Sequence, residues 1–174
     1  MKLTRKAVII GKTGKNITKE NALEYIAGYT PSNDVSARTW QKDPNYAGGV
    51  PQWCYAKGFD KFAPLGPMLV SPSVVGAADK LQLQTFVNGE ERQNTNTDDL
   101  LFNVRSIVSF LSQGSTLEKG TVILTGTPAG VAMGFKVPNY LKDGDLVEVK
   151  IEHLGSTKNR MVYEKGELVD WVLN

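Results

Sequence analysis

The sequence contains one cysteine, one histidine and no long run of apolar residues. Because Cys54 has no second cysteine to pair with, an intrachain disulfide is excluded and a reducing compartment is the default. Cys54 lies between Trp53 and Tyr55, where a buried structural thiol is favoured over a nucleophile. His153 has no nucleophile motif around it and lies near an expected hairpin turn, so a surface position is favoured.

Neither charge nor hydropathy favours a nucleic-acid or membrane partner. The 20 basic and 18 acidic residues are spread along the chain, and the basic stretch from Lys2 to Lys6 is short and lacks aromatic residues. No apolar run approaches the ~20 residues that a membrane-spanning helix needs, and Ala7 to Ile10 is too short for the core of a signal peptide. We therefore expect an intracellular protein, mitochondrial or cytoplasmic, with no targeting segment in this chain.

The pattern of short apolar runs predicts a β-rich α+β fold. A length of 174 residues suits one domain, which we expect to span residues 1–174. Asn88-Gly89 between two extended runs predicts a hairpin, because this pair favours the tight turn that joins antiparallel strands. The expected strands are 7–10, 29–35, 81–87, 121–124 and 146–151, the last pairing with 157–163; the expected helices are 18–25, capped by Thr18, and 100–111.

Several polar residues are candidates for a site, although each also has an ordinary interpretation. Asp34 follows Asn33, and this pair alone is typical of a turn in which the side chains bind their own backbone. Arg38 alone is typical of a surface ion pair, and Gln41 of a surface amide. A long connection rich in glycine and proline, residues 44–51, is typical of a mobile active-site loop.

Two further motifs favour a polar pocket. Lys57 lies in an apolar, strand-like stretch, residues 53–59, and desolvation there would lower its pKa toward neutrality. The turn Thr125-Gly126-Thr127-Pro128 follows an apolar strand, so its amides and hydroxyls project at a strand end, where they can bind an oxyanion or carboxylate.

Three stretches together carry a family resemblance. They are GYTPSNDVSARTWQ (28–41), WCYAKGFDKFAPLGP (53–67) and ILTGTPAGV (123–131). In this order they resemble the fumarylacetoacetate hydrolase family, and the resemblance covers most of the chain. It implies a mixed β-roll and a homodimer. It also implies that Arg38 and Lys57 are catalytic and that the substrate-binding residues are Arg38, Gln41, Lys57, Gly126 and Thr127.

The resemblance also implies a Mg²⁺ or Mn²⁺ ion held by Asp34 and by a Glu-x-Glu pair on an earlier strand. The run at residues 7–12 places that pair at Leu3 and Arg5, which cannot replace carboxylates. We also expect this chain to lack the family's N-terminal lid. Water competes well with a single carboxylate for a hard cation, so we expect weak metal binding and little turnover. If Met1 is the true start, the chain is N-terminally truncated relative to the family.

Two functions remain open at this stage. The stretches 28–41 and FKVPNYLKDGDLVEVKIEHLG (135–155) are most similar to the branch that contains oxaloacetate tautomerases. This implies an enzyme that acts on a small 2-oxo or 1,3-dicarbonyl acid through a metal-stabilised enolate, by tautomerisation, C–C hydrolysis or decarboxylation. The alternative is a catalytically impaired or non-catalytic truncated homologue that serves as a dimer partner.

Overall fold

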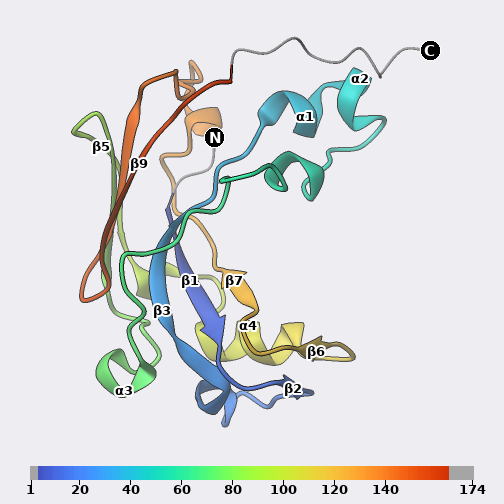
Figure 1. Ribbon diagram of the computed structural model, residues 1–174, viewed down its shortest axis with the longest axis vertical. Coiled ribbons are helices and arrows are strands. Elements are labelled where there is room, and N and C mark those ends of the chain that lie inside the picture. Colours follow the sequence, from blue (N-terminus) through green and yellow to red (C-terminus); the bar gives the residue numbers. More distant parts are fainter. Residues whose placement is uncertain (1–3, 165–174) are drawn as a thin grey trace.

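The computed structural model describes residues 4–164, which form an α+β fold built on antiparallel strands (Figure 1). The strands are β1 (Thr4–Ile10), β2 (Gly14–Lys15), β3 (Ile26–Asn33), β4 (Gln82–Val87), β5 (Glu90–Asn96), β6 (Thr116–Leu117), β7 (Val122–Leu124), β8 (Leu146–Ile151) and β9 (Gly155–Arg160). The α-helices are α1 (Arg38–Lys42), α2 (Pro44–Ala47), α3 (Pro72–Val75) and α4 (Val104–Leu111). The 3-10 helices are η1 (Ala22–Tyr25), η2 (Tyr55–Lys57), η3 (Thr97–Asp99) and η4 (Ala132–Gly134).

The strands form two main sheets. In the first, β1 lies between β3 and β7, so that Ala7 is paired with Thr30 on one side and with Leu124 on the other. The second has the order β5-β4-β8-β9, and β2 pairs with β6 in a small third sheet. Every one of these strand pairs is antiparallel. The arrangement brings the start of β1, the end of β3 and the end of β7 to one place.

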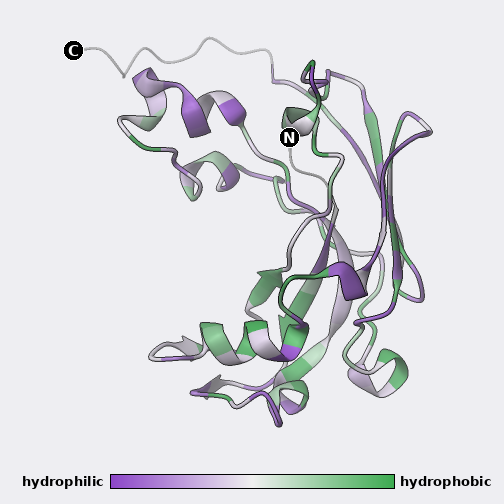
Figure 2. Cartoon of the chain, turned by 180° about the vertical axis from the view of Figure 1, so that it is seen from behind, coloured by the Kyte–Doolittle hydropathy of each residue, from purple (hydrophilic) through white to green (hydrophobic). Residues whose placement is uncertain are grey.

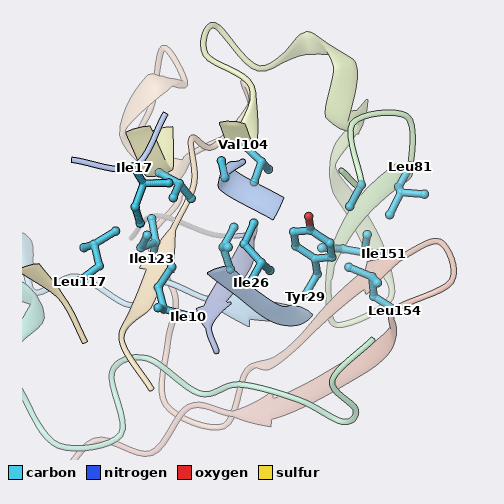
Figure 3. Packing of buried hydrophobic residues seen from close by; sticks show 14 of the residues in the cluster. Ile10, Ile17, Ile26, Tyr29, Leu81, Val104, Leu117, Ile123, Ile151 and Leu154 are labelled. Carbon is cyan, nitrogen blue, oxygen red and sulfur yellow. The ribbon is translucent and has the colours of Figure 1, made fainter. Parts of the chain in front are cut away.

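The main core lies between these sheets and helix α4 (Figure 3). Val8 and Ile10 project from β1, and Tyr29 from β3, into a cluster that α4 closes with Val104 and Val108. All of these side chains are fully buried or nearly so. Burial of a side chain of this size contributes roughly 1.5–3 kcal/mol. The core therefore fixes the strands whose ends carry the candidate site.

Several elements agree with the expectations from sequence. Strands β4 and β5 form the expected hairpin, with Asn88 and Gly89 at positive φ of 52° and 83°. The expected helix at 100–111 begins later, at Val104, because the Asn103 side chain caps it by accepting from Ser106 N. The expected helix from Thr18 is wrong. Only the single 3-10 turn η1 forms, since the chain immediately enters β3.

A separate lobe of short helices extends from the end of β3 and contains α1, α2 and η2 (Figure 1). Its α-helices are largely hydrophilic, whereas α4 and its neighbouring strands are largely hydrophobic (Figure 2). Two expectations are corrected here: Lys57 ends a 3-10 helix rather than lying on a strand, and Cys54 is exposed rather than buried. His153 is on the surface as expected, with 64% of its side chain exposed. Within residues 4–164, no helix has the length and apolarity to cross a membrane.

Candidate functional site

Asp34 lies where the three strands of the first sheet meet. Arg5 of β1 is paired with Ser32 of β3, so Asp34, two residues farther along, lies on the same face as a diagonal neighbour of Arg5. Arg5 Nε donates to Asp34 Oδ2 at 2.6 Å, and Arg5 Nη1 donates to the carbonyl oxygen of Thr125, just beyond β7. The Asp34 residue is only 5% exposed. Arg5 therefore links two strand ends: an ion pair joins it to the residue after β3, and a hydrogen bond joins it to the residue after β7.

Lys57 approaches the same carboxylate from the lobe of short helices. Backbone hydrogen bonds fix this approach, because Ala37 N donates to Ala56 O and Val35 N donates to Phe62 O, each at 2.9 Å. Lys57 Nζ then donates to Asp34 Oδ2 and, at 3.1 Å, to Ser36 Oγ. Asp34 thus receives hydrogen bonds from two cationic side chains.

The surroundings of Lys57 act on its pKa in opposite directions. Burial lowers the pKa below its ordinary value, and the positive charges of Arg5 and Arg38 lower it further. The hydrogen bond from Lys57 to Asp34 and the negative charge of that carboxylate oppose the shift. The net direction is downward, as expected from sequence, so deprotonation of Lys57 is easier than that of an ordinary lysine.

Arg38 and Gln41 form the second part of the site, one turn apart on α1. Arg38 Nη1 donates to Gln41 Oε1. Arg38 Nε, Arg38 Nη2 and Gln41 Nε2 are buried, and none of them has a hydrogen-bond partner among residues 4–164. Nε and Nη2 form one edge of the guanidinium group, the edge that matches the two oxygens of a carboxylate. Burial lowers the pKa of Arg38, which the charges of Tyr140 and Asp34 oppose.

Aromatic side chains hold the two parts of the site together. The Trp53 ring has Arg38 and Lys57 near it, with 5.9 Å from Arg38 Cζ and 6.0 Å from Lys57 Nζ to the ring centroid. Trp40 of α1 packs against Tyr55 of η2, with ring centroids 5.3 Å apart. An open cavity of about 950 Å³ lies beside α1, and its lining includes Ser36, Arg38, Tyr140 and Tyr163. Arg38 therefore faces a space larger than a small organic acid.

The predicted residues Gly126 and Thr127 directly follow Thr125, whose carbonyl oxygen accepts from Arg5. They line a smaller cavity of about 200 Å³ together with Lys6 and Thr125. The buried Gln93 of β5 holds this loop through Nε2, which donates to Thr127 Oγ1 at 3.2 Å, to Pro128 O at 3.0 Å and to Ala129 O at 3.2 Å. The structure thus brings Asp34, Lys57, Arg38 and Gln41 together, and Arg5 connects this group to the loop of Gly126 and Thr127 through the Thr125 carbonyl. The cavity that Gly126 and Thr127 line does not include Arg38.

The residues present do not fit a divalent metal ion. Asp34 Oδ2 already accepts from both Arg5 and Lys57, and a metal ion at this oxygen would have to displace them. Residues 4–164 contain no cluster of three or more histidine, cysteine, aspartate or glutamate side chains suited to a metal. Leu3, the other position of the expected carboxylate pair, lies outside the described residues.

The ion pair between Arg5 and Asp34 was not predicted from the sequence. The family resemblance placed Arg5 at one position of the expected carboxylate pair, but it did not indicate that Asp34 would be its partner. The missing signal was the register of β1 against β3, which makes these residues diagonal neighbours. The hydrogen bonds from Gln93 to the loop after β7 were not predicted either, because they join β5 to a loop more than 30 residues away.

Comparison with known proteins agrees with this fold. Residues 7–162 match the family described as fumarylacetoacetate (FAA) hydrolase C-terminal. A mitochondrial oxaloacetate tautomerase of Xenopus laevis is 43% identical over 156 residues, which cover 90% of this chain and 48% of the relative. The chain therefore spans about half the length of that relative.

Solved structures extend the similarity to three dimensions. A fumarylacetoacetate hydrolase from Exiguobacterium antarcticum superposes with a TM-score of 0.86 and 42% identity, covering 94% of this chain and 56% of that one. A fumarylpyruvate hydrolase from Pseudomonas aeruginosa, solved in complex with Mn²⁺ and pyruvate, gives a TM-score of 0.81 and 32% identity, covering 94% and 66%. On sequence and on fold, this chain belongs to the fumarylacetoacetate hydrolase family.

Proposed function

We propose that this chain binds a small 2-oxo or 1,3-dicarbonyl acid and interconverts its keto and enol forms, as an oxaloacetate tautomerase does. The observation that supports this most strongly is the unpaired edge of Arg38, where Nε and Nη2 are buried beside the unpaired Gln41 Nε2. A buried donor without a partner costs about 1–3 kcal/mol, so a carboxylate that accepts from these groups would bind favourably. Relatives named oxaloacetate tautomerase suggest the substrate class.

In this proposal, Lys57 moves the proton. Its ammonium group gives a proton to the carbon of the enol, and the resulting neutral amine takes the proton of the enol hydroxyl. Lys57 therefore ends charged as it began, and the net reaction is an isomerisation. Because the pKa of Lys57 is lowered, chiefly by burial, it releases a proton more easily than an ordinary lysine, which favours this exchange. The positive charges of Arg5 and Arg38 would stabilise the negative oxygen that develops between the two forms.

A second candidate is a binding protein without turnover, which serves as a partner in a homodimer. It is supported by Asp34, whose carboxylate is held between Arg5 and Lys57. In either case, Mg²⁺ or Mn²⁺ would bind weakly, because Asp34 is the one family ligand among the described residues.

The ketonisation of enol-oxaloacetate, followed by ultraviolet absorbance, tests the proposal. Lys57→Met should lower the rate at least about 100-fold, because a positioned proton carrier contributes 10²–10⁴ in rate. Lys119→Met, at an exposed lysine far along the chain, is the matched control and should leave the rate unchanged. If Lys57→Met retains the full rate, Lys57 is not the proton carrier. Ligand binding by the wild-type chain without any ketonisation would select the second candidate.

A further inference from the structure

The candidate site has more positive than negative charge. Three cationic side chains, Arg5, Arg38 and Lys57, surround the single carboxylate of Asp34. The Asp34 side chain is 7% exposed and that of Arg5 12%, so water screens these charges only partly. The net charge of this cluster is therefore positive before any ligand arrives. Such a cluster attracts an anion and repels a divalent cation.

Arg5 is also in a position to do part of the work of a metal ion. Its Nε and Nη1 atoms bind Asp34 and the Thr125 carbonyl, and a guanidinium group has five N–H donors in total. The group is always charged, so its positive charge does not depend on the availability of an ion. A divalent ion would instead need several oxygen ligands around it.

We propose that Arg5 is the built-in cation of this site, and that the site takes a small dicarboxylate or oxo acid without a metal ion. The identity of the ligand depends on the proposed function above, whereas the exclusion of the metal depends only on Arg5, Lys57 and Asp34. The two claims can therefore fail separately, and the experiments are chosen to separate them.

The first experiment measures Mn²⁺ binding by electron paramagnetic resonance, with no organic ligand present. The wild-type chain should bind Mn²⁺ with a Kd weaker than about 1 mM. Arg5→Glu replaces the cation by a carboxylate beside Asp34 and should tighten Mn²⁺ binding at least about tenfold. Circular dichroism checks that the variant is folded. A micromolar Kd in the wild-type chain would overturn the exclusion of metal whatever the variant does.

The second experiment uses calorimetry with oxalate, a planar dicarboxylate that resembles an enolised 2-oxo acid. The wild-type chain should bind oxalate with the same Kd, within about twofold, in EDTA and in Mg²⁺ at matched free oxalate. Arg5→Glu should lose binding in EDTA and regain it when Mn²⁺ is added. Undiminished binding by Arg5→Glu in EDTA would overturn the role of Arg5.

The outcomes of the second experiment also separate the two proposals. If the wild-type chain binds oxalate only with Mg²⁺, the inference fails and the proposed function survives. If it binds oxalate under neither condition, the proposed function fails, and the Mn²⁺ measurement still decides whether Arg5 excludes the metal.

Discussion

Arg5 and Lys6 are adjacent cationic residues on β1, and they lie on opposite faces of the strand. Arg5 contacts Asp34 and the Thr125 carbonyl at the candidate site. Lys6 faces the protein interior, where its fully buried Nζ donates to Ala78 O at 2.5 Å and lies 3.5 Å from Asp79 Oδ1. Because successive side chains of a strand alternate between faces, neighbouring positions in the sequence belong to different regions of the molecule.

The difference shows that a buried positive charge has different consequences in different surroundings. Arg5 shares a buried carboxylate with Lys57, so two positive charges face one negative charge in this group. Lys6 lines the smaller cavity but has no exposed surface, and burial lowers its pKa to about 8, although the charge and hydrogen bond of Asp79 oppose the shift. We therefore interpret Arg5 as a residue of the site and Lys6 as a residue that shapes the pH dependence of stability.

Removing the shared carboxylate should have the largest effect on stability. Asp34→Asn leaves Arg5 and Lys57 without their anionic partner, and breaking a buried ion pair in this way costs about 4 kcal/mol. Urea denaturation at pH 7 measures the change in the free energy of unfolding. Asp60→Asn, at an exposed aspartate in the same lobe, is the control and should change it by less than about 0.5 kcal/mol. An equal effect of the two variants would contradict the ion-pair interpretation.

Lys6, on the opposite face of β1, should make the free energy of unfolding depend on pH. Because the folded-state pKa of about 8 lies below the ordinary lysine value of 10.5, the unfolded chain binds a proton more readily between these values. The free energy of unfolding should therefore rise as the pH increases from 8 to 10.5, by about 3 kcal/mol in total, and the cost is fully present below pH 8.

The matched comparison for Lys6 is the variant Lys6→Met against Lys80→Met, which changes an exposed lysine. The denaturation midpoint is measured at pH 7.5 and at pH 9.5 for each chain. Its rise between these two pH values should be larger in the wild-type and Lys80→Met chains than in Lys6→Met. A pH dependence that survives Lys6→Met would assign the effect to another group.

The smallest expected effect is on oxalate affinity, through the unpaired edge of the Arg38 guanidinium group. Arg38→Lys keeps the charge and loses the planar fork, so oxalate should bind about tenfold more weakly, a loss of about 1.4 kcal/mol. Calorimetry measures the Kd. Lys136→Arg, a change between the same two residue types at an exposed position, is the control and should leave the Kd unaltered. An unchanged Kd in Arg38→Lys would mean that only the charge of residue 38 matters.

Local patterns predicted much of the fold. The Asn88-Gly89 hairpin, the helix ending at Leu111 and the strand before Thr125 depend on turn chemistry and periodicity within short windows, and all three are present. The helix expected from Thr18 was wrong, since residues 22–25 form only the 3-10 turn η1 and the Tyr25 carbonyl oxygen accepts from the distant Gly11 N and Lys12 N. The sequence also suggested the buried environment of Lys57, but not its 3-10 helix.

The candidate site was less predictable, because its contacts join distant segments. Asp34, Lys57 and Arg38 could be selected together only through the family resemblance. The bond from Arg5 to Asp34 depends on strand register, and the bond to Thr125 joins residues 120 positions apart. The exposure of Cys54 was missed for a related reason, since Tyr55 packs on Trp40 of α1 and the Trp53 ring lies near Arg38 and Lys57.

The hydrogen bonds from Gln93 to the loop after β7 should couple the local opening of this loop to that of β5. One amide nitrogen reaches Thr127, Pro128 and Ala129, so this loop cannot detach from β5 without losing all of those bonds together. Local opening in proteins occurs in cooperative units of this kind. The loop and the β4–β5 hairpin should therefore exchange their amide hydrogens as one unit, even though β7 itself belongs to the other sheet.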